Sequence, residues 1–313
     1  MKRTVEVVRG GLFSTVQDQG RQNVAAFGVS PAGAADWYSA CAANRLVFAD
    51  LDAPLIETTL DGITFVTDGA MEVAVTGAVA DLSINASPAE PWRTLPLRAG
   101  DRVQVHPATS GVRSYVAFGG GLEADVVMGS ASTDVSAGFG GHQGRALRAG
   151  DILALRQTDA DAPLRQVPPD DRPAWSAQQT LRVLPGPHLR RLGPSGAALA
   201  QGEAAFRVTP HANRQGIRLA GGRIAPYGWD AVSFGVCAGC VQVDHDGQPI
   251  ILLCDHQTTG GYGVAWVVIR ADLPLAAQLR PGELVALHPV TQAQAASALE
   301  ERLRACERIG SPT

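Results

Sequence analysis

Short segments in which apolar and polar residues alternate predict β-strands throughout the chain. These segments are rich in β-branched residues and end at turn-forming residues, as half-buried strands do. The clearest are residues 71–85, 101–107, 113–121 and 180–186. The pattern predicts strand-rich structure in both halves of the sequence, and 35 glycines and 20 prolines supply the turns that such a fold needs.

Two segments show the helical spacing of apolar residues instead. Asp36 precedes the first, residues 37–47, and its carboxylate is suited to cap a helix N-terminus. The second, residues 291–305, lies near the end of the chain and carries Glu and Arg in its second half.

One short pattern occurs three times. The segments that begin at Leu97, Leu147 and Leu279 read LRAGDRVQVHP, LRAGDILALRQ and LRPGELVALHP. Each combines a turn around an arginine and a glycine with an acidic residue and an alternating strand. The repeat favours two related β-rich domains, although chance reuse of one turn is the alternative.

A polar, proline-containing segment without periodicity separates the two halves. We predict an N-terminal domain in residues 1–157, a linker in residues 158–180 and a C-terminal domain in residues 181–313.

The composition excludes several classes of function. The 313 residues are 45% hydrophobic and 18% charged, which is typical of a globular protein. The net charge is −4 and no basic stripe is present, so we expect no nucleic-acid partner. No apolar run approaches the roughly 20 residues of a membrane-spanning helix, and the chain starts without an apolar signal segment. We therefore expect a cytoplasmic protein with no membrane partner.

Lys2 is the only lysine of the sequence. A phosphate-loop lysine, a Schiff-base lysine and a biotin-carrying lysine are therefore excluded from the body of the chain. An anion site must use arginine or backbone N–H groups, whatever the origin of the bias, for which a GC-rich genome is the simplest explanation.

Two glycine-containing segments of the N-terminal half could form binding loops. Residues 14–36 combine Gln17, Asp18, Arg21 and Asp36 with glycines and alanines. Residues 129–151 contain six glycines, several hydroxyl side chains and Arg145, but match no phosphate-loop motif. Structural loops are the alternative, with Asp18 and Arg21 paired to each other in the first.

Two polar segments of the C-terminal half are further candidates. Asn213, Arg214 and Arg218 could clamp a carboxylate or a phosphate, because residues i and i+4 of a strand share a face. A solvated strand face is the alternative. Residues 237–263 predict a hairpin with a two-residue turn at Asp246 and Gly247.

That hairpin register gathers four potential zinc ligands at one end: Cys237, Cys240, Cys254 and His256. Side-chain alternation places Cys240 and Cys254 in different rows, which argues against a shared metal ion. We therefore favour reduced, structural cysteines and predict no metal site. A disulfide is disfavoured in the cytoplasm.

Several stretches together resemble one family, known as KipA-like proteins, the C-type subunit of 5-oxoprolinase, allophanate hydrolase subunit 2 or biotin-dependent carboxyltransferases. They are TVQDQGR, FGVSPAGAAD, GSASTDVSAGFGGHQGRALRAGD, NRQGIRL, GQPIILLCDHQTTGGY and ADLPLAAQLRPGE, in the family's order. The resemblance covers most of the chain. It implies a mainly β fold with two cyclophilin-like β-barrel domains and a few short helices.

The resemblance also implies an enzyme subunit that works in a complex. The leading hypothesis is a component like the C-type subunit of an ATP-dependent 5-oxoprolinase, a hydrolase that opens the lactam of 5-oxoproline to glutamate. Its partners would be a KipI-like B-type subunit together with a LamB/YcsF-like A-type subunit. ATP with Mg²⁺ would be bound here or shared with the partners, and no biotin would be attached to this chain.

Two alternatives belong to the same resemblance. One is the carboxyltransferase component of a urea-carboxylase or allophanate-hydrolase-like system. The other is a non-catalytic KipA-type regulator that binds a KipI-like kinase inhibitor.

For lactam opening we predict two sets of residues. The developing charge needs arginines, and carboxylates could hold a proton or a metal ion, so the catalytic candidates are Asp18, Arg21, Asp36 and Asp255. The candidates for binding substrate or phosphate are Gln17, Arg145, Asn213, Arg214, Arg218, Gln242, Gln257, Thr258, Thr259 and Tyr262.

The sequence departs from the family pattern at four positions. Gly263 and Val264 stand where relatives have proline and lysine, Asp244 replaces a proline, and Phe234 replaces an acidic residue. If the missing lysine binds phosphate or carboxylate in relatives, this chain has a shifted substrate or has lost activity.

Overall fold

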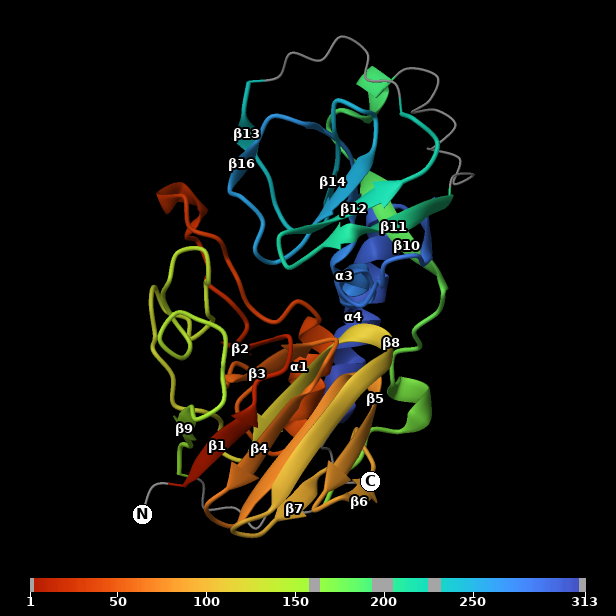
Figure 1. Ribbon diagram of the computed structural model, residues 1–313. Coiled ribbons are helices and arrows are strands. Elements are labelled where there is room, and N and C mark those ends of the chain that lie inside the picture. Colours follow the sequence, from red (N-terminus) through yellow and green to blue (C-terminus); the bar gives the residue numbers. More distant parts are fainter. Residues whose placement is uncertain (1–2, 158–163, 193–204, 225–231, 310–313) are drawn as a thin grey trace. The chain divides into compact units, whose positions relative to one another are not determined.

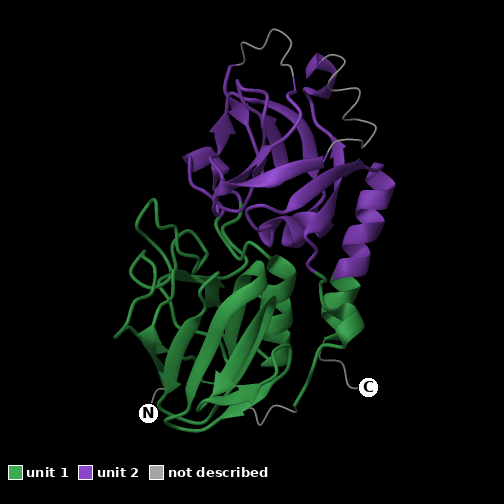
Figure 2. Cartoon of the chain, turned by 45° about the vertical axis from the view of Figure 1, so that its right-hand side comes forward, with its two compact units in different colours: residues 1–22, 32–174, 303–313 green, residues 23–31, 175–302 purple. Residues whose placement is uncertain are grey.

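The computed structural model of the chain describes residues 3–157, 164–192, 205–224 and 232–309 (Figure 1). The chain divides into two compact units, coloured separately in Figure 2. Unit 1 consists of residues 1–22, 32–174 and 303–313, and unit 2 consists of residues 23–31 and 175–302. The main division falls within the predicted linker, of which residues 158–163 lie outside the described segments. Residues 23–31 belong to unit 2 although they lie near the start of the sequence. Residues 303–313 belong to unit 1 although they lie at its end.

Unit 1 is built on a nine-stranded antiparallel sheet. Its main path runs β2-β3-β8-β4-β1-β9, and β5 pairs with β6, β7 and β8. The strands are β1 (Thr4–Arg9), β2 (Phe13–Gln17), β3 (Leu55–Thr59), β4 (Ile63–Thr67), β5 (Met71–Ile84), β6 (Ser87–Ala89), β7 (Leu95–Leu97), β8 (Arg102–Phe118) and β9 (Ile152–Ala154).

The strands predicted in residues 101–107 and 113–121 are one continuous strand, β8. It pairs with β5 along most of its length, and the register shifts between Gly77 and Leu82 absorb the irregular part. Gly111 takes a positive φ of 74° at this point. The prediction of two separate strands was wrong, because β-bulges rather than a turn accommodate the residues between the two predicted segments.

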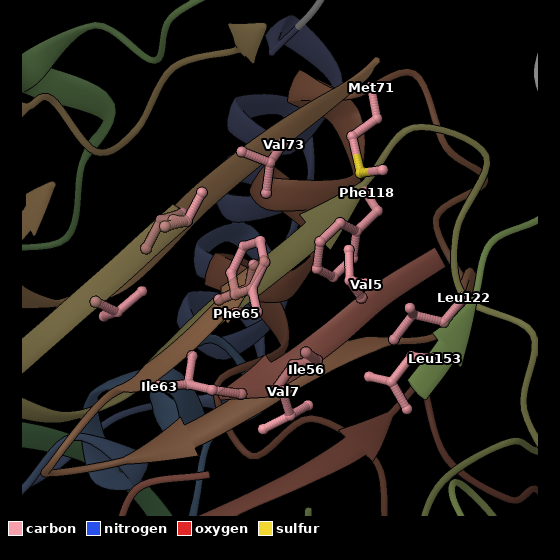
Figure 3. Close-up of a cluster of buried hydrophobic side chains, with 14 of the residues drawn as sticks. Val5, Val7, Ile56, Ile63, Phe65, Met71, Val73, Phe118, Leu122 and Leu153 are labelled. Carbon is pink, nitrogen blue, oxygen red and sulfur yellow. The ribbon is translucent and has the colours of Figure 1, made fainter. Parts of the chain in front are cut away.

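One face of the sheet carries the main core of unit 1 (Figure 3). Alternate residues of each strand point to this face, so Val5 and Val7 of β1 both enter the core. Phe65 and Phe118 meet edge to face, with ring centroids 5.4 Å apart. This packing fixes the strand ends from which the loops of residues 18–36 and 123–151 leave.

Helix α1 (Trp37–Leu46) packs in a second cluster of unit 1. The carboxylate of Asp36 accepts hydrogen bonds from the Ser39 backbone N–H at 3.0 Å and the Ser39 hydroxyl at 2.6 Å, which confirms the predicted N-cap. A disulfide joins Cys41 of α1 to Cys306 of α4 (Gln292–Arg308). The sequence did not predict this bond, because the expected cytoplasmic location disfavours disulfides.

Unit 2 contains a closed seven-stranded barrel in the order β10-β17-β14-β15-β12-β11-β18. Its strands are β10 (Gln178–Pro185), β11 (Ala205–Ala212), β12 (Gly216–Ala220), β14 (Cys240–Val243), β15 (Pro249–Leu252), β17 (Gly263–Val268) and β18 (Leu284–Pro289). β10 and β18 pair in parallel, and the other neighbours are antiparallel. A separate ribbon pairs β13 (Phe234–Gly235) with β16 (Thr259–Gly260).

The barrel interior is filled with side chains from all seven strands, including Phe206, Val241, Ile251 and Trp266. The neighbouring residues of β14 and β15 point outward and form a smaller cluster on the outer surface. The barrel lumen is therefore a packed core, and a ligand site must lie outside it.

Short helices complete the fold within the described segments. They are α3 (Leu273–Ala277), the capped helix α4, and 3₁₀ turns at Ala25–Phe27, Pro169–Asp171, Leu189–Leu192 and Arg270–Asp272. In α4, Thr291 and Gln294 exchange hydrogen bonds as a capping box, and the predicted C-terminal helix is confirmed. No helix of the described segments is long and apolar enough to cross a membrane. The mainly β fold class is confirmed, with a half-barrel in unit 1 and a closed barrel in unit 2.

The three copies of the repeated pattern form the same turn. The carboxylates of Asp101, Asp151 and Glu283 each accept a hydrogen bond from the backbone N–H three residues earlier, at 2.7, 2.9 and 2.8 Å. The glycine before each acid has a positive φ of 84°, 88° and 93°. Its N–H donates to Thr67, Val7 and Val208 respectively, so each turn is fastened to a neighbouring strand.

The hairpin of β14 and β15 differs from its predicted register by one residue. Val243 pairs with Pro249, and the Asp244 N–H donates to the Gln248 carbonyl. The Asp244 side chain also accepts from the N–H groups of Asp246 and Gln248. This carboxylate stabilises a longer loop in place of a two-residue turn, with Gly247 at φ 76°.

Candidate functional site

A cavity of about 500 Å³ lies on the outer surface of the unit 2 barrel. Strands β12, β14 and β15 form one wall through the outward-facing residues Gly216, Arg218, Gln242, Ile250 and Leu252. The remaining lining residues come from the end of β11, the β11–β12 connection and the segment between β15 and β17: Pro210, His211, Ala212, Asn213, Gln215, Gln257 and Tyr262. Alternation in β-strands places these side chains opposite those that fill the barrel.

Two side-chain amides and a backbone carbonyl form a hydrogen-bonded group at the cavity. Gln242 is only 1% exposed. Its Nε2 donates to the Tyr262 carbonyl at 3.5 Å, and its Oε1 accepts from Gln257 Nε2 at 3.3 Å. Both hydrogen bonds are long, so a ligand amide could replace them with shorter ones at little cost.

Arg218 supplies positive charge at this cavity. Its Nη1 lies 3.1 Å from Asp244 Oδ2, and 48% of its side chain remains exposed to solvent. The other oxygen of Asp244 holds the β14–β15 loop. Asp244, which stands where the resemblance implies a proline, therefore orients Arg218 and shapes the hairpin at once.

Arg214 and Asp255 form a bidentate ion pair beside the cavity, with N–O distances of 2.8 and 2.9 Å. The Arg214 side chain is only 7% exposed. The Asp255 N–H also donates to the Arg214 carbonyl at 2.9 Å. The pair fastens the β11–β12 connection to the segment that follows β15.

Thr259 belongs to the ribbon of β13 and β16 (Figure 1), Thr258 directly precedes β16, and neither residue lines the cavity. The Val236 N–H donates to the Thr258 carbonyl at 3.1 Å. Gly260 of β16 lies against Gln242, because a Cβ on Gly260 would come within 2.6 Å of Gln242 Nε2. The ribbon therefore sets the position of the amide pair.

Two of the departures from the family pattern lie together. Val264 is buried in the outer-surface cluster, and Phe234 packs against the same cluster. His188 accepts from the Val264 N–H at 3.0 Å and faces the Phe234 ring at a centroid distance of 4.8 Å. The two positions at which the resemblance implies a lysine and an acid are thus both apolar here.

The predicted N-terminal residues lie in unit 1, where Asp18 and Arg21 stabilise loops. Asp18 accepts from the hydroxyls of Ser130 and Ser132 at 2.6 Å and from the Ala131 N–H at 2.6 Å. Arg21 donates to the Val127 and Ser132 carbonyls, so the pairing of Asp18 with Arg21 considered above is not what the structure shows.

Gln17 joins the same two loops. Its Nε2 donates to the Thr133 carbonyl at 3.2 Å, and its Oε1 accepts from the Gly33 N–H at 3.2 Å. The glycine-rich segments of residues 14–36 and 129–151 therefore do pack together within unit 1, through side chains that hold the backbone.

A buried network around Asp36 was missed by sequence reasoning. The Asp36 N–H donates to the Tyr115 hydroxyl at 2.7 Å, and that hydroxyl donates to Glu57 at 2.9 Å. Arg113 lies 3.5 Å from Glu57. Burial, with the Glu57 charge next in size, raises the pKa of Tyr115 well above its ordinary value. The available signal was Glu57, a charged residue in the middle of the short strand β3.

Arg145 is engaged by a carboxylate of its own chain. Its Nη1 and Nη2 each lie 2.7 Å from one oxygen of Asp151. The hydrogen bonds from Arg145 lower the pKa of Asp151 to about 2. In the glycine-containing loop that could bind an anion, Arg145 is thus already paired with Asp151.

The four potential zinc ligands do not come together. Among the residues that the structure describes, no group of three or more His, Cys, Asp or Glu side chains could hold a metal ion. Cys254 donates to the Arg214 carbonyl, and the His256 ring lies 2.6 Å from the Gln257 carbonyl. Only Cys237 and Cys240 approach each other, with their sulfurs 3.6 Å apart.

The predicted site residues thus separate into three groups: residues that line the cavity, residues that support it, and residues of unit 1. Five of them line the cavity: Asn213, Arg218, Gln242, Gln257 and Tyr262. Arg214, Asp255, Thr258 and Thr259 support it from neighbouring positions of unit 2, while Gln17, Asp18, Arg21, Asp36 and Arg145 lie in unit 1. Their roles in binding and catalysis stay predictions. Sequence reasoning missed His211 and Gln215, although Gln215 belongs to the NRQGIRL stretch and His211 lies two residues before it.

The chain is thus a mainly β protein that combines a half-barrel with a closed barrel, and the closed barrel carries a polar cavity on its outer surface. Residues 27–289 match the family described as carboxyltransferase domain, subdomain A and B, and the chain belongs to this family.

Individual relatives place the chain more closely. It is 35% identical over 309 residues to the C-type subunit of 5-oxoprolinase from Escherichia coli, a match that covers 97% of each chain. It is 32% identical over 292 residues to the C-type subunit of 5-oxoprolinase from Haemophilus influenzae, with 90% of each chain covered.

The solved structure of Kluyveromyces lactis urea carboxylase is also similar. It superposes with a TM-score of 0.93 at 26% identity, and the match covers 99% of this chain but 29% of that one. The chain is thus close to the C-type subunit of 5-oxoprolinase and is also related to part of urea carboxylase.

Proposed function

We propose that the chain is the C-type subunit of an ATP-dependent 5-oxoprolinase, which opens the lactam of 5-oxoproline to glutamate. The observation that carries this proposal is the end-to-end match to the 5-oxoprolinase component of the same type. In urea carboxylase, by contrast, the corresponding region is less than a third of the chain. A chain of this size would therefore need partner subunits for a carboxyl-transfer cycle.

The cavity chemistry fits a small lactam acid. 5-Oxoproline carries a carboxylate, a lactam N–H donor and a lactam carbonyl acceptor on a five-membered ring. Arg218 can bind the carboxylate, and the amides of Gln242 and Gln257 can pair with both lactam groups. Ile250 and Leu252 offer apolar contact to the ring methylenes.

A lactam carbonyl is a weak electrophile, so the ring needs activation. ATP would supply it by phosphorylating the lactam oxygen, after which water adds to the carbon and the C–N bond breaks with loss of phosphate. This chain would bind and orient the substrate. ATP would bring Mg²⁺, bound here or shared with the partner subunits.

The relatives are named as one subunit of 5-oxoprolinase, which supports a multi-subunit enzyme. We propose that a KipI-like B-type subunit together with a LamB/YcsF-like A-type subunit would complete the active site, in the cytoplasm where ATP is available. Asp18, Arg21, Asp36 and Asp255 remain the catalytic candidates of this chain, although each already holds local structure.

Coexpression with the KipI-like and LamB/YcsF-like proteins of the same genome tests this function. The purified, reduced complex should release glutamate from 5-oxoproline only when ATP is present. We expect Arg218→Met to raise KM about tenfold or more by removing the charge-assisted bond to the carboxylate. Arg207→Met, an exposed arginine of β11 that does not line the cavity, is the matched control.

Three outcomes would contradict the proposal. A well-formed complex without ATP-dependent glutamate release would exclude it. Carboxylation of urea in the presence of carboxybiotin carrier would favour the carboxyltransferase alternative. A stable complex that only relieves kinase inhibition would favour the regulator.

A further inference from the structure

Cys237 and Cys240 face each other across a fixed turn in unit 2. Their sulfurs are 3.6 Å apart, and the Cys240 N–H donates to the Cys237 carbonyl at 3.1 Å. Gly239 takes a positive φ of 89°, and a Cβ there would come within 2.7 Å of the Val268 carbonyl oxygen. The Cys-Ala-Gly-Cys segment is therefore held in a conformation that presents the two thiols to each other.

The surroundings make this pair chemically active. The Cys237 backbone N–H donates to Cys240 Sγ, and the two sulfurs share a further hydrogen bond. The side-chain hydrogen bond from Cys237 lowers the pKa of Cys240 to about 6, and the same bond raises the pKa of Cys237. Thiolates are the reactive form of cysteine in exchange reactions. Cys237 is exposed while Cys240 is buried, so one sulfur is reachable from solvent and its partner is protected.

We propose that Cys237 and Cys240 are a redox site that closes reversibly to an intramolecular disulfide and thereby changes the outer-surface cavity. The oxidant is an external disulfide of low molecular weight or on a redox protein. The proton shared by the two sulfurs moves to Cys240, and the Cys237 thiolate attacks the external disulfide and releases one thiol. Cys240 then loses its proton and attacks the mixed disulfide at Cys237, which releases the second thiol.

The electrons and atoms balance in this exchange. One protein thiol and one protein thiolate lose two electrons and one proton, and the external disulfide becomes one thiol and one thiolate, which takes its proton from water. The redox site does not depend on the proposed function, because it requires only the geometry of the two cysteines.

The disulfide acts on the cavity through two connections. Cys240 and Gln242 point to the same outer face of β14, and Cys240 packs with the cavity residues Ile250 and Leu252. Cys237 follows β13, which pairs with β16, and Gly260 of β16 lies against Gln242. A disulfide shortens the sulfur separation to about 2.05 Å. It therefore draws Cys237, which follows β13, toward Cys240 at the start of β14, and so restrains the ribbon of β13 and β16.

The other cysteines have different surroundings. Cys41 and Cys306 already form a disulfide in unit 1, and Cys254 donates to the Arg214 carbonyl. Cys254→Ser is therefore a matched control that removes a thiol of the same unit without touching the pair.

The test equilibrates the full chain in glutathione buffers of graded redox potential, followed by trapping with an alkylating reagent and peptide mass mapping. Wild type and Cys254→Ser should gain one disulfide, between Cys237 and Cys240, that dithiothreitol reverses. Cys237→Ser and Cys240→Ser should each abolish it. If the pair stays reduced when the buffer is fully oxidised glutathione, the redox site is excluded.

Hydrogen exchange of the same samples tests the coupling to the cavity without any substrate or turnover. We expect the backbone amides of residues 257–262 to exchange at least about threefold more slowly in the oxidised form, with no such change in Cys237→Ser. A disulfide that forms without altering exchange in this segment would overturn the proposed link to the cavity. Because neither readout needs activity, the failure of either is distinct from failure of the 5-oxoprolinase proposal.

Discussion

At the residue scale, three arginines each meet a carboxylate in different surroundings. The side chain of Arg214 is 7% exposed, that of Arg145 24% and that of Arg218 48%. A buried bidentate pair fixes structure, whereas an exposed, single contact leaves the guanidinium able to exchange partners. Arg218 is therefore the arginine among these three that is best placed to meet an anionic ligand.

The Arg145–Asp151 pair should make stability depend on acid. The folded pKa of Asp151 is lowered to about 2 from an ordinary 3.8, so its contribution is complete above about pH 4 and is lost as the pH falls toward 2. At pH 7 we expect Asp151→Asn to lower the free energy of unfolding by about 1 kcal/mol, a value reduced for solvent screening.

Urea unfolding of both proteins between pH 7 and pH 3 measures this effect. The difference between wild type and Asp151→Asn should shrink as the pH approaches 3. Asp61→Asn is the control, because its pairing partner Arg9 and Asp61 itself are both well exposed. A difference that stays constant down to pH 3 would contradict the ion-pair explanation.

At the element scale, the β13–β16 ribbon and the β14–β15 hairpin determine the cavity. The hairpin is a local structure, whereas the ribbon joins segments that lie before β14 and after β15, and Gly260 of the ribbon lies against Gln242 on the outward face of β14. Small changes in the ribbon should therefore alter ligand binding more than stability.

The two ribbon glycines allow a direct test. Gly260→Ala places a methyl group 2.6 Å from Gln242 Nε2 and 3.3 Å from Gln257 Nε2, so the amide pair must move. We expect the affinity for 5-oxoproline to fall about tenfold, which corresponds to about 1.4 kcal/mol. Calorimetry on the assembled complex measures it.

Gly235→Ala, on the paired strand, meets no atom within 4 Å and should bind like wild type. Equal affinities for the Gly260→Ala and wild-type proteins would show that the amide pair does not contact the ligand.

The paired departures at Phe234 and Val264 can be tested by a double-mutant cycle. Val264→Lys alone should destabilise unit 2 by roughly 3 kcal/mol, because it buries an ammonium group without a carboxylate. Adding Phe234→Glu should recover at least about 1 kcal/mol of that loss if the two positions interact. Denaturant unfolding gives all four free energies, and strict additivity would show that the two replacements are independent.

At the scale of the whole molecule, the two compact units exchange segments of the chain. Residues 23–31 belong to unit 2, where the Ser30 hydroxyl donates to the Cys254 carbonyl at 3.2 Å. The end of α4 belongs to unit 1, where Cys306 is bonded to Cys41. Neither unit is therefore made from one continuous piece of sequence.

The Cys41–Cys306 disulfide closes a loop across 265 residues. Its removal should destabilise unit 1 by about 2–5 kcal/mol, since a bond between such distant residues restricts the unfolded chain strongly. Thermal unfolding of Cys41→Ser under non-reducing conditions measures the loss, and Cys254→Ser is the control. An unchanged melting temperature in Cys41→Ser would mean that non-covalent packing alone holds the end of α4.

Much of this architecture follows from local sequence. Alternation placed β5 and β10, helical spacing and the Asp36 cap placed α1, and the repeated acid-containing turns correctly marked the strands that follow them. These features depend on interactions within a few residues, which a sequence displays directly. The family stretches also identified mainly β structure and the relationship to the C-type subunit of 5-oxoprolinase.

The rest depended on contacts between distant residues. The sequence by itself determined the strands, the caps, the three similar turns and a cluster of polar residues around DHQTTGGY. Only the tertiary structure decided that Asp18 and Arg21 both bind the loop around Ser132 rather than each other, that Asp244 lengthens the hairpin loop, and that Cys41 meets Cys306. It also decided that the site lies on the outer face of the barrel. The physical reason is that a strand's alternation gives two faces, and only closure of the barrel determines which one is packed and which remains open to a ligand.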